Sequence, residues 1–193
     1  MRQIDGVYFS PTIRFGSIDF EERSSLIPAV RDRIYGYYLD PVKVLIEREM
    51  GFAAGVLLIS AIDGIAEMML NDSKSADRLI PWLSKYVNEF SQADTDRPGR
   101  KYANTFNDFF RHKLIHNSRI AEGGQFSLLI DDIMTIKDKT MIVNPFLLLA
   151  KTCQIFDSFC EELRNTSTKK FELLSKRCLK NFKKEIELDM SWQ

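Results

Sequence analysis

Residues 41–70 read PVKVLIEREMGFAAGVLLISAIDGIAEMML, and this stretch decides the fold class. Asp40 stands directly before Pro41, which is typical of a helix start, because aspartate caps the first turn and proline lacks only an amide hydrogen that is not needed there. Residues 52–62 are apolar nearly all round, which is typical of the central helix of a bundle. The uncharged run is shorter than the roughly 20 residues that a membrane span needs. We therefore expect one long core helix that ends near residue 70.

Apolar residues at three- and four-residue spacing predict further helices before and after this one. The expected helices cover residues 20–39 with an interruption near Pro28, 76–90 with a break or restart near Pro81, 100–114, 144–165 and 167–188. In residues 118–143 the pattern changes to short apolar runs between turn residues. Strands are expected at residues 126–130, 133–136 and 140–143, with the tip of a hairpin at 137–139.

The predicted fold is therefore mainly α, a helical bundle with a small β-hairpin insertion at about residues 118–143. Residues 1–40 form an N-terminal extension that contains short extended pieces and a helix. Residues 41–190 form the bundle.

Composition limits the partners and the cellular compartment. The 193 residues carry 27 Lys+Arg and 27 Asp+Glu, so the overall charge gives no attraction to nucleic acid or to a membrane. The three cysteines, Cys153, Cys160 and Cys178, form no Cys-x-x-Cys motif, which favours reduced thiols in a cytoplasm. The first residues lack the apolar run of a signal peptide. We expect a cytoplasmic protein without a membrane partner.

Residues 109–117, FFRHKLIHN, hold both histidines of the chain, His112 and His116. Four residues apart, the two side chains would share one face of a helix. A metal site needs three or four ligands, and no acidic residue lies nearby at a matching spacing. We therefore expect neither a metal nor another cofactor.

Arg111 and His116 form the pattern Arg-x4-His, with the polar residue His112 directly after the arginine. This pattern resembles the signature of the HEPN family, and the resemblance extends from about residue 42 to residue 190. It implies an α-helical bundle with metal-independent endoribonuclease activity, of the kind found in toxins and defence effectors. It also implies a homodimer in which two facing motifs build one composite site, and an antitoxin as a further partner.

The residue types suit cleavage of RNA. A histidine titrates near neutral pH, so His116 can take a proton from a ribose 2′-hydroxyl or give one to the leaving 5′-oxygen. An arginine fork binds phosphate through two hydrogen bonds. On an ideal helix Arg111 and His116 would point roughly 140° apart, so either the helix bends or ends near His116, or two copies combine. His112 would orient or supplement His116, and Asn117 could add a donor.

Asp63 and Glu67 are carboxylates in the otherwise apolar core stretch. A carboxylate there needs a partner or a cavity, so Asp63 could hold Arg111 or a histidine in the site. The alternative is that the helix reaches the surface near its end. Similarly, an arginine and two histidines at a helix end could be only solvated cations, which the helix dipole favours there.

Residues 164–184 hold eight basic residues against one glutamate. Lys176, Arg177 and Lys180 could follow an RNA backbone, or they could form the solvated face of an amphipathic helix. The first functional hypothesis is the endoribonuclease. The alternatives are a non-catalytic HEPN-like module that binds a nucleotide, RNA or a protein partner, and an unrelated dimeric scaffold.

Overall fold

The core stretch forms two helices where the sequence predicted one. In a computed structural model that describes residues 2–3, 6–70, 78–112, 120–165 and 168–190, α2 spans Asp40–Glu47 and α3 spans Gly51–Met69. Between α2 and α3, Glu49 adopts a left-handed backbone with φ of 58°, which interrupts the regular helix. The expectation of one unbroken helix is therefore wrong, although α3 is a core helix. Its buried residues are Ala54, Gly55, Leu58, Ile59, Ala61, Ile62, Ile65 and Ala66.

Asp40 begins α2, but it does not cap a free helix end, which corrects a second expectation. The five residues before it, Tyr35–Leu39, form a π-helix, and α1 spans Arg23–Ile34 before them. Asp40 has helical angles, φ −65° and ψ −46°, so its carboxylate caps no free helix end. The predicted interruption at Pro28 is also wrong, because Pro28 lies within α1. A proline removes one helical hydrogen bond, and the buried face of α1 outweighs that loss.

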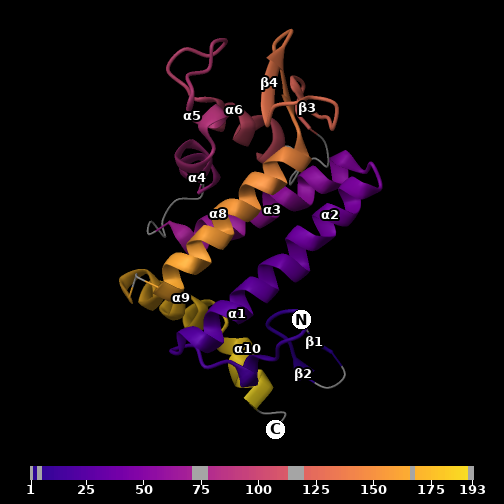
Figure 1. The fold of residues 1–193 in the computed structure, drawn as a ribbon. Helices are drawn as coiled ribbons and strands as arrows, with labels where there is room; N and C mark the ends of the chain where they lie inside the picture. Colours follow the sequence, from indigo (N-terminus) through magenta and orange to yellow (C-terminus); the bar gives the residue numbers. More distant parts are fainter. Residues whose placement is uncertain (1, 4–5, 71–77, 113–119, 166–167, 191–193) are drawn as a thin grey trace. The chain divides into compact units, whose positions relative to one another are not determined.

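The chain divides into two compact units. We call residues 1–40 with 156–193 the first unit and residues 41–155 the second unit. Helices dominate the described part of both, as Figure 1 shows, so the predicted mainly α class is confirmed. The long helix α8, Pro145–Asn165, contributes residues to both units. Asn144 caps it as predicted, because its side-chain oxygen accepts a hydrogen bond from the amide of Phe146 at 2.9 Å.

In the first unit, the two ends of the chain pack together. Strands β1 (Arg2–Gln3) and β2 (Gly6–Val7) pair antiparallel, and the 3₁₀ turn η1 covers Phe15–Ser17. The last predicted helix is two helices, α9 (Thr168–Asn181) and α10 (Lys183–Met190). The chain turns between them at a phenylalanine, residue 182, whose ring lies 5.4 Å from that of Phe9.

A buried carboxylate holds this packing. Asp189 on α10 is fully buried and accepts hydrogen bonds from the amides of Val7 at 3.0 Å and Gly16 at 2.6 Å. The guanidinium of Arg14 lies 3.0 Å from the same carboxylate. Burial raises the pKa of Asp189, but these hydrogen bonds lower it further, so the net pKa lies below its ordinary value.

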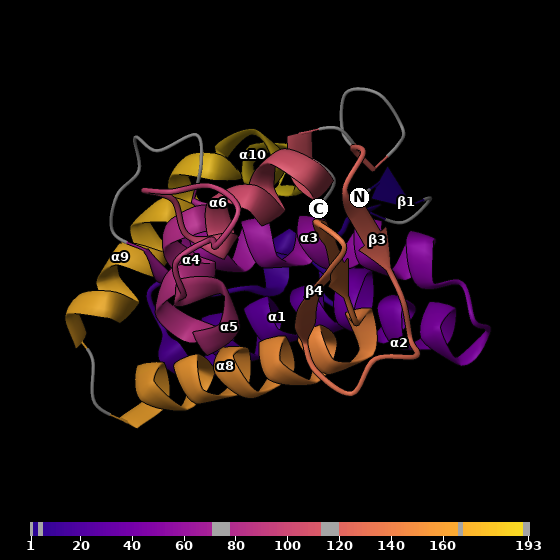
Figure 2. The ribbon, with the colours of Figure 1, turned by 90° about the horizontal axis from the view of Figure 1, so that it is seen from above.

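In the second unit, short helices and a sheet pack on α3. Helices α4 (Leu79–Tyr86), α5 (Asn88–Ser91) and α6 (Tyr102–Phe106) lie on the same side of α3 as the sheet in Figures 1 and 2. The expected helix over 76–90 is interrupted at Val87, and α4 begins at Leu79, close to the restart predicted at Pro81. Pro81 lies in the first turn of α4, where its missing amide hydrogen costs little. Residues 76 and 77 lie outside the described part.

The β insertion is larger than a hairpin. Strands β4 (Met134–Lys137) and β5 (Thr140–Val143) form the expected hairpin, and β3 (Gly124–Phe126) pairs parallel with β5. The expected strand at 126–130 is therefore placed too late in the sequence. At the end of β3, the ring of Phe126 lies close to α3: a Cβ on Gly55 would lie 2.3 Å from this ring, so only glycine leaves room for it.

Candidate functional site

Arg111 lies on a π-helix. Helix α6 ends at Phe106, and Asn107–His112 continue it as the π-helix η3, which has one more residue in each hydrogen-bonded turn than an α-helix. Three aromatic rings hold this segment: the rings of Phe106 and Phe110 stack with centres 4.8 Å apart, and the ring of Phe126 is tilted against that of Phe110 at 4.8 Å. The expected helix over residues 100–114 is thus present from Tyr102 as far as residue 112, but its winding changes at Asn107.

The structure brings Arg111 and Asp63 together. Nη2 of Arg111 lies 3.3 Å from Oδ2 of Asp63 on α3. The arginine side chain is 17% exposed and the aspartate side chain 37%. The sequence left open whether Asp63 would meet Arg111, a histidine or solvent, and the structure shows a contact with Arg111. A partly buried carboxylate of this kind holds the guanidinium in a fixed direction.

Glu67, one turn further along α3, belongs to a different contact. Its Oε2 lies 3.0 Å from Nη1 of Arg78, at the start of α4. The two carboxylates that the sequence placed together therefore have separate arginine partners. Each ties α3 to a different following segment.

His112 is the last residue of η3, and the structure describes its backbone alone. His116 and Asn117 lie outside the described residues. Their roles in the site stay predictions.

No metal centre is found among residues 2–3, 6–70, 78–112, 120–165 and 168–190, where no three His, Cys, Asp or Glu residues gather closely enough to hold an ion. None of the three cysteines forms a disulfide. Burial raises the pKa of the Cys160 thiol to about 12, which keeps it protonated and chemically inert at neutral pH.

The basic residues of α9 belong to the first unit, whereas Arg111 belongs to the second. Lys176 and Lys180 are exposed and Arg177 is half-buried. The opposite side of α9 buries Phe171, Leu174 and Cys178, so this helix is amphipathic with a basic outer face. This arrangement agrees with both interpretations of the run, a nucleic-acid contact and a solvated face.

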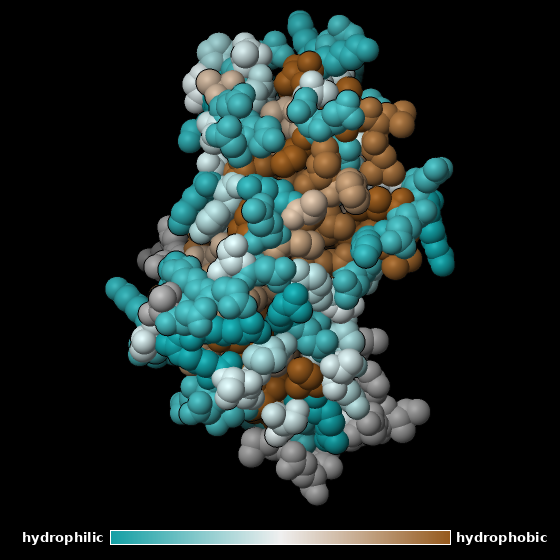
Figure 3. All heavy atoms as spheres, in the orientation of Figure 1, coloured by the Kyte–Doolittle hydropathy of each residue, from teal (hydrophilic) through white to brown (hydrophobic). Residues whose placement is uncertain are grey.

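One helix in the described part, α3, has the length and apolar composition of a membrane span. Its buried residues form the core of the second unit, and Asp63 and Glu67 on it are paired with arginines. Near α3, large apolar side chains are exposed on α2, the start of α3 and the start of α8, where Figure 3 shows hydrophobic surface. They are Val44, Met50, Phe52 and Phe146, each between 45% and 53% exposed.

Sequence reasoning missed a cavity of the second unit. It lies between the loop after α5, the π-helix and the β4–β5 hairpin, and its volume is about 200 Å³. The loop residues Asp94, Asp96 and Arg97 lie between the expected helices 76–90 and 100–114, where the sequence predicts no site. Charged residues on both sides of a sharp turn were the available signal.

No protein-family model, no curated protein and no solved structure matches this chain.

Proposed function

We propose that this chain is a metal-independent endoribonuclease of the HEPN type, acting in the cytoplasm as a toxin or defence effector. The observation that carries the proposal is the Arg111–Asp63 contact at 3.3 Å. It supplies a guanidinium with a fixed direction, five residues before a histidine, on a helical bundle.

In the proposed reaction, a histidine takes the proton of a ribose 2′-hydroxyl, and the 2′-oxygen attacks the adjacent phosphorus. The bond from phosphorus to the 5′-oxygen breaks, and a second histidine gives that oxygen a proton. The products are a 2′,3′-cyclic phosphate and a 5′-hydroxyl end. His116 is the proposed base or acid, and His112 orients or supplements it. Neither role needs a metal ion.

Arg111 would bind the phosphate as its negative charge grows. A guanidinium has five N–H donors in a planar fork, so one edge can stay with Asp63 while another meets phosphate oxygens. Asp63 is thus a positioning residue, and Asn117 adds a donor. The wider turn of η3 changes the facing of Arg111 relative to an ideal α-helix.

The proposed active form is a homodimer with two facing motifs. The roughly 140° between Arg111 and His116 on an ideal helix motivates it. The exposed apolar side chains of α2, α3 and α8 support it, because such patches on a soluble surface mark interaction sites. An antitoxin would be a partner of the same surface, and Lys176, Arg177 and Lys180 would add weak RNA contacts.

The same ion pair favours a second candidate. An arginine whose side chain is only 17% exposed can serve simply to tie η3 to α3. The chain would then be a non-catalytic HEPN-like module that binds a nucleotide, RNA or a protein partner.

Cleavage of a labelled RNA in EDTA separates the two candidates. We expect His116→Ala to reduce cleavage by about a hundredfold or more while RNA affinity changes little. Arg111→Lys keeps the charge but loses the planar fork, so cleavage should also fall strongly. Lys43→Arg, an exposed change on α2, is the matched control. Binding of RNA without cleavage by the wild type would support the non-catalytic module, and a strict Mg²⁺ requirement would refute the mechanism.

A further inference from the structure

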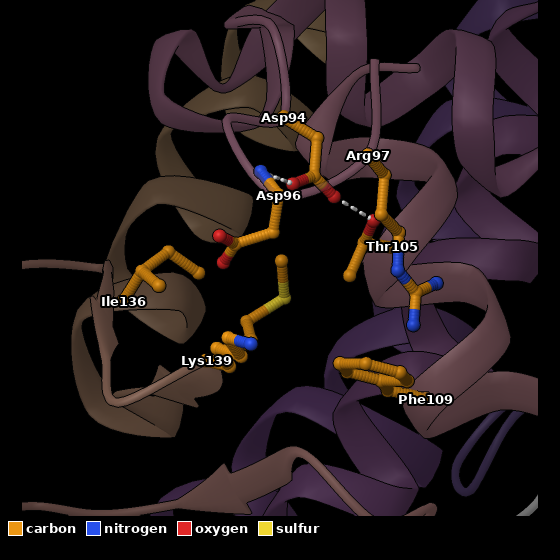
Figure 4. A pocket seen from close by; sticks show the side chains of 8 residues that line it. Asp94, Asp96, Arg97, Thr105, Phe109, Ile136 and Lys139 are labelled. Atoms are coloured by element: carbon orange, nitrogen blue, oxygen red, sulfur yellow. Dashed lines mark hydrogen bonds between the residues drawn. The ribbon is translucent and has the colours of Figure 1, made fainter. Parts of the chain in front are cut away.

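The cavity of the second unit is built like a small-molecule site (Figure 4). One side is apolar and the rim is charged, which is the usual pattern of a ligand pocket. The residues that line it include Asp96, Arg97, Phe109, Ile136, Lys139 and Met141. At about 200 Å³ it suits a single flat ring system better than a large ligand.

The apolar side has a rigid aromatic ring. The guanidinium of Arg97 lies 4.5 Å from the centre of the Phe109 ring. On the hairpin side, a Cβ on Gly123 would lie 3.1 Å from the same ring, so the glycine backbone is in close contact with it. Ile136 and Met141 complete the apolar lining. A flat ligand therefore meets a stacked arginine and aromatic pair whose position is already fixed.

The charged rim is also fixed by the fold. Asp94 is buried, and its two carboxylate oxygens accept hydrogen bonds from the amide of Asp96, at 2.9 Å, and from the hydroxyl of Thr105. Asp94 thus holds the loop in place. Lys139 at the hairpin tip has a left-handed backbone with φ of 61°. In Figure 4 the side chain of Asp96 comes from the loop and that of Lys139 from the hairpin, and both line the cavity.

We propose that this cavity binds a guanine nucleotide. The Watson–Crick edge of guanine carries a ring N–H and an amino group, both donors, which match the two oxygens of the Asp96 carboxylate. The same edge of adenine presents a bare ring nitrogen, which repels a carboxylate. The purine stacks on the Arg97–Phe109 pair, as bases do on arginine planes and aromatic rings. The phosphate reaches the ammonium of Lys139 at the open rim.

This site is distinct from the Arg111–Asp63 contact. Phe109 and Arg111 are two residues apart on η3, and residues at that spacing point to different sides of a helix. Phe109 lines the cavity, whereas Arg111 meets α3. The inference therefore does not depend on the proposed RNA cleavage. The guanine could belong to a free nucleotide or to an RNA strand.

Isothermal titration of the full chain with GMP, AMP and guanosine tests the proposal. We expect GMP to bind at least about tenfold more tightly than AMP, because one base edge is matched and the other is not. Asp96→Asn should abolish this preference. Lys139→Gln should weaken GMP several-fold and leave guanosine unchanged, whereas Lys137→Gln, an exposed change in the same hairpin, should alter neither.

Two further arms identify the source of the guanine and separate the two proposals. The affinity of a 2′-O-methylated pentanucleotide with one central guanosine is compared with that of GMP. Tighter binding of the pentanucleotide identifies guanine in an RNA strand as the ligand, and tighter binding of GMP identifies a free nucleotide; either result supports the site. Arg111→Lys should leave GMP binding unchanged. The proposal is overturned by absent GMP binding at millimolar concentration, by equal affinity for AMP, or by an Asp96→Asn variant that keeps the preference. Asp96 and Lys139 are exposed, so both variants should fold.

Discussion

Replacing Asp189 by asparagine should destabilise the first unit strongly, although the side chain keeps its shape. The carboxylate is fully buried and receives three donors, two on Oδ1 from Val7 and Arg14 and one on Oδ2 from Gly16. In Asp189→Asn, the amide oxygen can serve the first two donors. The amide nitrogen then faces the N–H of Gly16, donor against donor.

The magnitude follows from these contacts. One hydrogen bond to a charged group contributes roughly 1.5–3 kcal/mol, and here one is lost while two lose the charge of their acceptor. We expect the free energy of unfolding to fall by about 3 kcal/mol at pH 7. Urea unfolding followed by far-ultraviolet circular dichroism measures it. The matched control is Glu187→Gln on the same helix, which loses only an exposed 3.8 Å contact with Lys183 and should change little.

The effect should depend on pH in one direction. Burial alone would raise the pKa of Asp189, but its hydrogen bonds lower the pKa below the ordinary value. A lowered pKa means that the stabilisation is complete above the ordinary value of about 3.9 and disappears as the pH falls through the lower folded value. The difference between wild type and Asp189→Asn should therefore be constant above about pH 5 and shrink below about pH 4. Equal urea midpoints for Asp189→Asn and Glu187→Gln at pH 7 would refute the reasoning.

Three other results are expected. Gly55→Ala should lower the free energy of unfolding by roughly 1–3 kcal/mol, because the new methyl group meets the Phe126 ring. Gly64→Ala on the same helix has open space and should raise the free energy of unfolding by about 0.5–1 kcal/mol, and a thermal melt of each variant measures the difference. Iodoacetamide at pH 8 should label the half-buried Cys153 first and leave Cys160 unmodified in the folded chain. Mass spectrometry of peptides measures this labelling, and early labelling of Cys160 would contradict its burial. Sedimentation at tens of micromolar should show a dimer, and a monomer there would count against the composite site.

The helix starts show how far local sequence reasoning reaches. Asn144-Pro145 and Asp40-Pro41 have the same form, but only the first stands at a free helix end. Asn144 follows a strand, so the amides of the first helical turn are open and its side chain caps them. Asp40 follows residues that are already helical, so no free amides remain for it. The dipeptide describes a possible cap, and the preceding chain decides whether one exists.

The Arg111–Asp63 contact was also predictable only in part from local sequence. A carboxylate in an apolar helix needs a partner, and this argument found Asp63 without any structure. The choice of Arg111 as partner depends on how η3 winds, and the π-helix has no simple residue signature. The cavity was missed because its lining comes from a loop, a helix and a hairpin whose proximity is tertiary. The two helices in place of one at residues 40–70 depend on a single left-handed residue, Glu49.

The π-helix makes Arg111 sensitive to chain length as well as to side-chain chemistry. A turn closed by the bond from residue i to i+5 contains one residue more than an α-turn, so deleting one residue between Phe106 and Arg111 would allow an ordinary α-helix. Because the π-turn takes up that extra residue, the deletion would leave the direction of Arg111 nearly unchanged, whereas α-helical winding at the present length would rotate Arg111 by roughly 100°, the step of one α-helical residue. Rewinding without a deletion would therefore keep Arg111 in the chain and turn it away from Asp63. The length of this segment and its π winding are matched to each other, so both are as decisive for the site as its residues.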